Sequence, residues 1–300
     1  MVVERRCLIY PVRKQLDRFI NFKKEIWNMK KNYFLVFSLL VLFCAAMNGS
    51  LFAQASLPVY EAFDYTAGNL TGNAGWTLTG ANTLSPVQVV DTSLTFTDLP
   101  DSVGRKVSVL NGSSYEDPGF DIVTTGNQSE NSSIYASFIV NVVSPGSVEE
   151  YFFHICSAGT TSTDFHSRVF AKMGAGGTGF YNIGIRNHNN DTPVYEALDR
   201  AVGTPIFVAV SYDFIIGDDN DTSRMWINTA LGQSSPPAAD LTATAVVANM
   251  DLAGAGRVNL RQPSASTGLS EEVDELRVGT TWASVTPQKA GSGVNDWTLY

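Results

Sequence analysis

The stretch EEVDELRVGTTWASVTP, at residues 271–287, decides the fold. β-Branched and apolar residues recur at Val273, Leu276 and Val278 before a Gly-Thr-Thr break, and such residues favour strands. Pro287 ends the stretch because proline has no N–H group for further pairing. The pattern predicts a closing strand with a small docked tail, which completes a two-sheet sandwich built from the strands before it.

Apolar runs separated by polar turns rich in Gly, Ser, Thr and Asn recur along the rest of the chain. Runs of this length predict strands. The segment IYASFIVNVV at residues 134–143 is nearly continuous in its apolar character, which predicts a central strand buried on both faces.

Gly-rich residues 173–178 predict a hairpin turn rather than a phosphate-binding loop, since no helix pattern follows. We expect strands at residues 58–65, 75–78, 87–90, 106–110, 134–143, 150–157, 168–172, 179–185, 206–214, 223–228, 245–252 and 257–262.

With the closing strand, these runs amount to about twelve to fourteen strands, the number expected for two stacked sheets. No capped helix and no repeat of 20 to 50 residues is evident. The fold class predicted from the sequence is therefore all-β, a two-sheet antiparallel β-sandwich preceded by a signal peptide.

Four segments resemble the concanavalin A-like (laminin-G-like) jelly-roll domain of secreted Bacteroidetes-type surface proteins. They are DELRVGTTWASVTP at residues 274–287, YEAFDY at 60–65, SRVF at 167–170, and VSYDF at 210–214 leading to MWIN at 225–228. Together they span most of the chain from residue 57 to 287. The resemblance implies a jelly-roll fold and an extracellular location, and it implies no particular reaction.

The N-terminal part of the chain predicts export. Residues 29–31 are Met-Lys-Lys, residues 33–46 are apolar, and FAQA at 52–55 has the small-x-small pattern of a cleavage site. The apolar run of about 14 residues is shorter than the ~20 that a spanning helix needs, so we expect no membrane anchor in the mature chain.

The sequence divides into four predicted segments. Residues 1–28 are interpreted as a mis-called start or an N-terminal extension, residues 29–55 as the signal peptide and residues 56–287 as the sandwich domain. Residues 288–300 are interpreted as a linker and the start of a truncated C-terminal region.

Charge separates at the predicted signal peptide. The whole chain has 20 basic and 29 acidic residues, of which the first 31 residues hold nine and three, so the remainder has 11 and 26 and a net charge of about −15. A surface this acidic repels phosphate backbones and argues against a nucleic-acid partner. We expect a secreted or outer-surface protein. Its single remaining cysteine, Cys156, cannot form a disulfide within the domain and is expected to be a small buried apolar residue.

The acidic loop GDDNDT at residues 217–222 is the candidate metal site. Asp218, Asp219 and Asp221 provide the hard oxygen ligands that Ca²⁺ prefers. The loop lacks the glycine and the downstream glutamate of an EF-hand. The alternative is an acidic hairpin tip in which Asp, Asn and Gly serve the turn geometry.

Enzyme chemistry has little support in the sequence. Glu272 and Asp274 begin like the Glu-x-Asp-x-x-Glu signature of jelly-roll glycoside hydrolases, but residue 277 is Arg, and Asp274 is equally suited to a structural hydrogen bond. Glu149 and Glu150 are adjacent, so in a strand they point to opposite faces.

The histidines and tryptophans are also expected to be structural. The three histidines, His154, His166 and His188, match no metal-ligand spacing and are expected to be scattered over the sandwich. The three tryptophans of the predicted domain, which could stack on sugars if exposed, are expected to pack in the interior; they are Trp76, Trp226 and Trp282.

These observations lead to one functional hypothesis and two alternatives. The chain is expected to be a secreted or cell-surface binding or adhesion module without catalytic activity. The resemblance implies a carbohydrate ligand, so the expected partner is an extracellular polysaccharide or a cell-surface component. The alternatives are a structural spacer domain that binds nothing and, third, a glycoside hydrolase-like enzyme.

Overall fold

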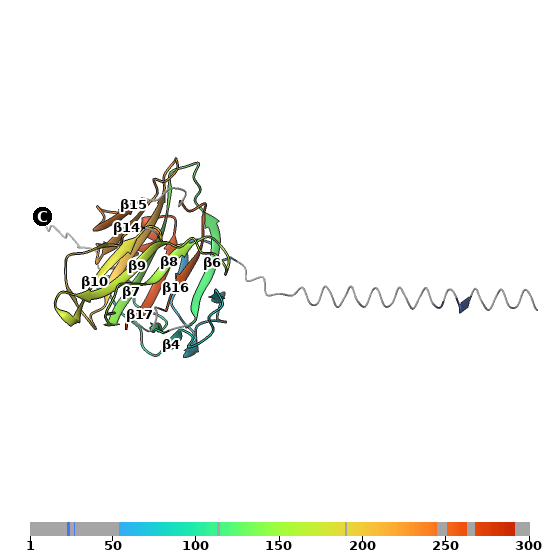
Figure 1. Ribbon diagram of the computed structural model, residues 1–300, viewed down its shortest axis with the longest axis horizontal. Coiled ribbons are helices and arrows are strands. Elements are labelled where there is room, and N and C mark those ends of the chain that lie inside the picture. Colours follow the sequence, from blue (N-terminus) through green and yellow to red (C-terminus); the bar gives the residue numbers. More distant parts are fainter. Residues whose placement is uncertain are drawn as a thin grey trace, which may run out of the picture. The chain divides into compact units, whose positions relative to one another are not determined.

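The computed structural model describes residues 54–112, 115–189, 191–244, 251–262 and 268–291, together with residues 23, 24 and 27. Two antiparallel sheets pack face to face, as Figure 1 shows, and together form a β-sandwich. One sheet has nine strands in the order β15-β14-β13-β7-β17-β5-β4-β2, with β1 also paired to β17. The other has eight strands in the order β11-β10-β9-β8-β16-β6-β3, with β12 also paired to β10. The prediction of an all-β, two-sheet antiparallel sandwich is confirmed.

Consecutive strands often lie in the same sheet, since β8 to β12 belong to the eight-stranded sheet and β13 to β15 to the nine-stranded sheet. Their bounds are β1 Val59–Glu61, β2 Gly68–Asn69, β3 Thr77–Thr79, β4 Gln88–Val90, β5 Lys106–Val109, β6 Asp117–Thr125, β7 Ser132–Ser144, β8 Glu150–Cys156, β9 His166–Gly174, β10 Gly177–Arg186, β11 Val194–Tyr195, β12 Arg200–Ala201, β13 Ile206–Phe214, β14 Thr222–Ile227, β15 Leu241–Thr244, β16 Ala255–Leu260 and β17 Ser270–Gly279. A one-turn helix, α2, spans Trp282–Val285. The predicted Gly-rich hairpin turn joins β9 to β10, with Gly177 at a φ of 87°.

The closing strand β17 occupies the centre of the nine-stranded sheet. It pairs with β7 along one edge, where Val273 lies opposite Val140, and with β5 and β1 along the other. A bulge interrupts the β7 pairing between Asp274 and Arg277, and Glu275 adopts a φ of 55° there. The prediction that this last strand completes the sandwich is confirmed.

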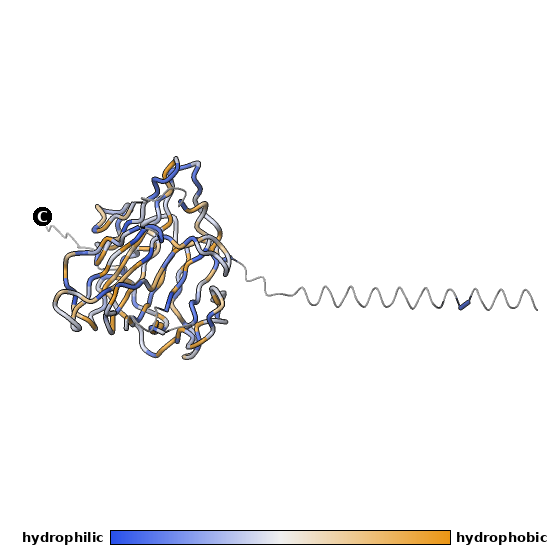
Figure 2. The backbone as a smooth tube through the Cα atoms, in the orientation of Figure 1, coloured by the Kyte–Doolittle hydropathy of each residue, from blue (hydrophilic) through white to orange (hydrophobic). Residues whose placement is uncertain are grey.

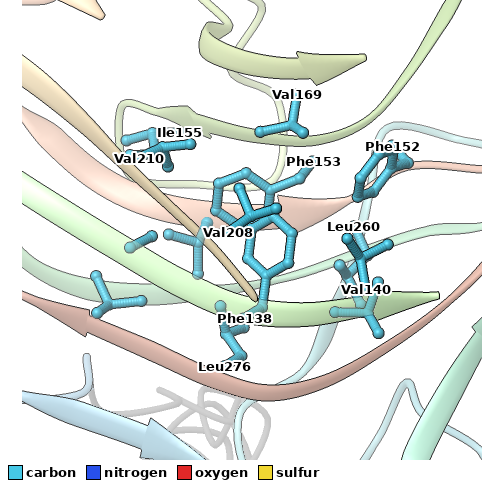
Figure 3. Packing of buried hydrophobic residues seen from close by; sticks show 14 of the residues in the cluster. Phe138, Val140, Phe152, Phe153, Ile155, Val169, Val208, Val210, Leu260 and Leu276 are labelled. Carbon is cyan, nitrogen blue, oxygen red and sulfur yellow. The ribbon is translucent and has the colours of Figure 1, made fainter. Parts of the chain in front are cut away.

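The core lies between the sheets. Phe138 and Val140 of β7, together with Val208 of β13, face Phe153 of β8 and Val169 of β9 (Figure 3), and all five side chains are fully buried. Polar and apolar positions alternate along many strands (Figure 2), as expected when each strand has one face in the core.

The outer face of the nine-stranded sheet is covered by a second apolar cluster. Ile139, Phe207 and Trp226 point away from the main core and pack against Leu94 and Trp282 from the segments outside the sheet. This cover explains why residues 134–143 are apolar on both faces. The three tryptophans of the domain are buried, with exposed fractions of 1 to 2% for Trp76, Trp226 and Trp282, so the prediction that they pack in the interior is confirmed.

Several elements differ from the predictions. β6, β15 and the short strands β2, β11 and β12 were not predicted, so the described residues contain seventeen strands rather than twelve to fourteen. In the predicted strand at 245–252, residues 245–250 lie outside the described residues, and residues 251 and 252 belong to no strand. The predicted N-terminal segment 1–28 and signal peptide 29–55 lie almost wholly outside the described residues, as do residues 292–300 of the predicted linker. Within the described part of the chain, no helix has the length and apolar character needed to span a membrane.

Candidate functional site

The outer face of the eight-stranded sheet differs from that of the nine-stranded sheet, because it carries arginines and aromatic rings in place of an apolar cover. On β8, Phe153 and Ile155 point into the core, so His154 points outward. Neighbouring strands add outward side chains of the same kinds, and Figure 1 shows these strands side by side in the order β10, β9, β8, β16. We call this set the arginine–aromatic face; it comprises Tyr151, His154, Phe165, Arg168, Phe170, Arg186 and Arg261.

Tyr151 lies at the centre of this face. The guanidinium carbon of Arg168 lies 4.5 Å from the centroid of its ring, and that of Arg261 lies 4.2 Å away. Phe170 packs against the same ring with a centroid distance of 5.4 Å. Burial raises the pKa of the Tyr151 hydroxyl, while the charges of Arg261 and Arg168 act in the opposite direction. The hydroxyl therefore stays protonated at neutral pH.

Aromatic rings also position the two arginines on β9 and β10. Arg168 stacks on Phe165 at 5.2 Å and donates a hydrogen bond from Nε to the Phe165 carbonyl at 3.2 Å. Arg186 stacks on Phe170 at 4.7 Å. Cation–π contacts of this kind are worth about 0.5 to 2 kcal/mol and orient a guanidinium without neutralising it.

Two further arginines on or beside β16 have partners within the protein. Arg261 forms an ion pair with Glu150. Arg257 is completely buried and donates to Asp121 at 3.0 Å, to the Gly119 carbonyl at 2.9 Å and to Thr77 at 2.9 Å. Arg257 therefore joins β16, β6 and β3 and is a structural residue of this sheet.

The histidines are not scattered, contrary to the prediction. The rings of His166 and His188 lie 5.0 Å apart, and His166 packs edge-on against Tyr212 at 5.0 Å. His154 stacks on Phe165 at 4.3 Å, and neither of its ring nitrogens has a hydrogen-bond partner. Burial, which is the largest cause, lowers the pKa of all three, to about 3 for His166. They are neutral near pH 7 and add no positive charge to the face.

The acidic loop places its three aspartates in different environments. Asp221 is completely buried, and its carboxylate accepts hydrogen bonds from the Tyr212 hydroxyl at 2.7 Å, the Gln128 amide at 2.7 Å and the Ile215 backbone N–H at 2.7 Å. Asp218 is exposed and Asp219 is outside the buried core. Within the residues that the structure describes, no three His, Cys, Asp or Glu side chains are grouped so as to hold a metal ion. Calcium binding at Asp218, Asp219 and Asp221 stays a prediction.

The residues considered for glycoside hydrolysis have structural partners. Asp274 is buried and accepts hydrogen bonds from backbone N–H groups, in keeping with its structural interpretation. Glu272 forms an ion pair with Lys106 at 2.8 Å. Cys156 is buried, as expected, and its Sγ accepts a hydrogen bond from Asn259.

A separate depression of about 400 Å³ lies where β11 and β15 approach each other. Its polar groups are satisfied within the protein, because Arg200 donates to Glu196 at 2.6 and 2.8 Å and Asp240 accepts from the Ile227 N–H at 2.8 Å. A ligand there would compete with these bonds, so the arginine–aromatic face is the stronger candidate. Its lining comprises Tyr195, Glu196, Ala197, Leu198, Arg200, Ile227, Asp240 and Leu241.

No sequence signal pointed to Tyr151, Arg168, Arg186 or Arg261 as a group. They are dispersed along the chain, and only the pairing of β8 with β9 and β16, and of β9 with β10, brings them together. The alternation of polar and apolar residues on these strands was the available signal, since it placed the arginines on the face away from the core.

Comparisons with known proteins identify no family. No protein-family model matches the sequence, and no curated protein matches it. Solved structures with a similar fold include a protein of unknown function from Shewanella oneidensis MR-1, at 12% identity and a TM-score of 0.38, covering 81% of this chain and 93% of that one. Another is the CBM2 module of the evolved Dit of Lactobacillus casei BL23 phage J-1, at 11% identity and 0.39, covering 74% and 94%. A third is an alginate lyase from Alteromonas sp. 272, at 8% identity and 0.33, covering 68% and 92%. Because these TM-scores are all below 0.4, the similarities carry no argument about function, and the candidate site is argued from its own geometry.

Proposed function

We propose that this protein is a binding module whose ligand is a carbohydrate, held on the arginine–aromatic face of the eight-stranded sheet. The observation that carries the proposal is the contrast between the two outer faces. The nine-stranded sheet is covered by an apolar cluster around Trp226 and Trp282, whereas the outer side of the eight-stranded sheet carries guanidinium groups stacked on shielded rings around Tyr151.

This combination suits a sugar ligand. A guanidinium provides several N–H donors with a defined geometry for the hydroxyl oxygens of a sugar, and the aromatic rings beneath hold the guanidinium groups in position. The rings of Tyr151 and Phe170 are largely shielded, with exposed fractions of 8% and 3%, so ligand contacts fall mainly on the half-buried Arg186 and Arg261 beside them.

The rest of the proposal follows from the sequence. The export pattern at residues 29–55 and the acidic composition suggest a secreted or outer-surface protein, in which case the partner is an extracellular polysaccharide or a cell-surface component. The resemblance to concanavalin A-like domains of Bacteroidetes-type surface proteins points in the same direction. A role without catalysis is part of the proposal.

Affinity electrophoresis of the purified protein against a panel of neutral and acidic polysaccharides tests the proposal. We expect retardation by at least one polysaccharide, weakened about tenfold by Tyr151→Leu, because the central ring and its arginine contacts are lost. Tyr60→Leu is the matched control, since Tyr60 lies on β1 of the other sheet and is 46% exposed. The unfolding midpoint of each variant shows whether it is folded. Absence of retardation across the panel would contradict the proposal and favour the structural-spacer alternative.

A further inference from the structure

We propose that Arg168 and Arg186 form a receptor for an anionic group, a carboxylate or a sulfate ester, on the ligand of the arginine–aromatic face. The inference rests on the proposed carbohydrate-binding function for the identity of the ligand, but the anion site itself is argued from the two arginines alone.

The first observation is that these two arginines lack the ion pair that every other arginine of the described sandwich has. The sandwich contains eight arginines. Six of them pair with a carboxylate, namely Arg105 with Asp91, Arg200 with Glu196, Arg224 with Asp213, Arg257 with Asp121, Arg261 with Glu150 and Arg277 with Glu275. Among the ion pairs of the described residues, none involves Arg168 or Arg186.

The second observation is the burial of Arg168. Only 2% of this residue is exposed, and its Nη2 atom is buried without any hydrogen-bond partner. Burial, as the largest cause, lowers the pKa of its guanidinium to about 10, so the group stays charged at neutral pH. Removing a charge from water without a counter-ion is costly, and the contacts with Tyr151 and Phe165 offset only part of that cost. A bound anion would supply the missing partner.

The third observation is that Arg168 and Arg186 lie directly opposite each other on β9 and β10. Directly opposed residues of an antiparallel pair have Cβ atoms about 4.5 to 5.5 Å apart, and like charges at that distance destabilise the sheet. The Nε atom of Arg186 is also buried and lacks a partner. One anion bound by both guanidiniums would relieve this repulsion and satisfy both buried N–H groups.

Nearby carboxylates are already engaged or stand farther away. Glu150 is the partner of Arg261. Burial, as the largest cause, lowers the pKa of Arg186, and Glu149 and Asp191 act against this from a distance. Asp191 accepts a hydrogen bond from the His188 backbone N–H at 2.9 Å. The neighbouring His154 and His188 have lowered pKa values and are neutral at pH 7, so they neither compete for the anion nor add to its binding.

The geometry of the groups defines the ligand class. Guanidinium forks bind carboxylate, sulfate and phosphate oxygens in a bidentate manner. If the ligand of this face is a glycan, as proposed above, one bearing a uronic-acid carboxylate or a sulfate ester matches the guanidinium groups that Tyr151 and Phe170 hold in position. Such a site would also give an acidic protein selective affinity for a polyanion, since the local charge differs from the net charge.

Matched pairs of polysaccharides distinguish the two sources of the anion. Polygalacturonate is compared with its fully methyl-esterified form, and chondroitin sulfate with desulfated chondroitin, by titration calorimetry at fixed ionic strength. We expect the charged member of one pair to bind about tenfold or more tightly than its neutral or desulfated counterpart. The pair that shows the difference identifies the group as carboxylate or sulfate.

Variants assign the effect to the site. Arg186→Gln is expected to remove the preference for the charged member, whereas Arg186→Lys, which keeps the charge but not the fork, restores part of it. Arg105→Gln is the matched control, because it removes one half-buried positive charge elsewhere and is expected to leave the preference intact. Arg168→Gln is measured alongside; if it does not fold, the half-buried Arg186 still carries the test.

Simple anions separate this inference from the proposed function. Sodium glucuronate and sodium sulfate are each compared with sodium chloride at equal ionic strength, with the unfolding midpoint as readout. A rise that Arg186→Gln abolishes supports the anion site even if no polysaccharide binds. If polysaccharides bind irrespective of charge and Arg186→Gln changes nothing, the anion site is wrong while the binding function stands. If neither polysaccharides nor simple anions have an effect, both are wrong.

Discussion

The backbone N–H of Leu94 donates a hydrogen bond of 2.7 Å to the carboxylate of Asp274, which lies 180 residues later in the chain. The second carboxylate oxygen accepts from the Glu275 N–H, also at 2.7 Å. The contact joins the segment that covers the nine-stranded sheet to the bulge in its central strand. Asp274 therefore contributes to the position of this cover, although in sequence it resembles half of a catalytic pair.

Asp274 makes stability depend on pH. Burial, as the largest cause, raises the pKa of this carboxyl to about 7. Between pH ~4 and ~7 the native state keeps a proton that the unfolded chain releases, so this group lowers the free energy of unfolding as pH rises, by up to about 1.4 kcal/mol per pH unit. We expect Asp274→Asn to flatten that decline in urea unfolding measured at pH 4, 5, 6 and 7. Asp101→Asn, at an exposed site, should leave the slope as it is; equal slopes for wild type and Asp274→Asn would contradict the prediction.

Glu271 is a carboxyl group in the core. It pairs opposite Val109 and Val142, whose side chains belong to the core, so its own side chain points between the sheets. It is 1% exposed, both of its oxygens lack a hydrogen-bond partner, and burial raises its pKa well above the usual range.

Replacing this carboxyl with an apolar group should stabilise the protein. We expect Glu271→Leu to increase the free energy of unfolding by about 1 to 3 kcal/mol at pH 7, because an unsatisfied polar group is removed from the core. Glu272→Leu is the control on the neighbouring position. It should destabilise instead, since Glu272 pairs with Lys106 and accepts from Asn141. Equal effects of the two variants in urea unfolding would show that Glu271 has a partner in solution.

Two aspartates of the acidic loop should behave differently. Asp221→Ala leaves the Tyr212 hydroxyl, the Gln128 amide and the Ile215 N–H without their acceptor, so we expect a loss of about 3 to 5 kcal/mol in the free energy of unfolding. Asp218→Ala, at an exposed position, should change it by less than about 0.5 kcal/mol. A similar cost for both variants would mean that Asp218 also has a structural partner.

Calcium can be tested on the same loop without disturbing Asp221. If the loop binds Ca²⁺, excess Ca²⁺ raises the unfolding midpoint relative to EDTA, and Asp218→Ala or Asp219→Ala abolishes the rise. No rise in the wild-type protein would leave the loop as a hairpin tip held by Asp221.

The strands with long apolar runs could be predicted from the sequence because one of their faces lies in the core. β13 matches its predicted range at both ends, and β7 was recognised as doubly buried. β6 was missed because it begins Asp117-Pro118-Gly119, a pattern typical of a turn. The structure explains the glycine, since a Cβ at Gly119 would lie 2.1 Å from the Asn259 Oδ1 atom and 2.8 Å from the Arg257 Nε atom.

The candidate site could not be predicted in the same way. In the sequence, Arg168 and Arg186 look like ordinary outward-facing residues of a hairpin. Their sequence neighbours do not distinguish them from Arg224, which forms an ion pair. What distinguishes them is the absence of a paired carboxylate on the described strands that become their neighbours, which depends on the order β10-β9-β8-β16. The order of strands in a sheet depends on the whole chain, so no short segment of the sequence reveals it.

The central position of β17 also has a consequence for synthesis. Until residue 279 has left the ribosome, the nine-stranded sheet lacks the strand that joins β7 to β5, and two half-sheets would each present an open edge. Such edges are templates for aggregation. The domain therefore completes its fold only after this strand has been made, and products that terminate before it are substrates for chaperones and proteases rather than smaller working domains.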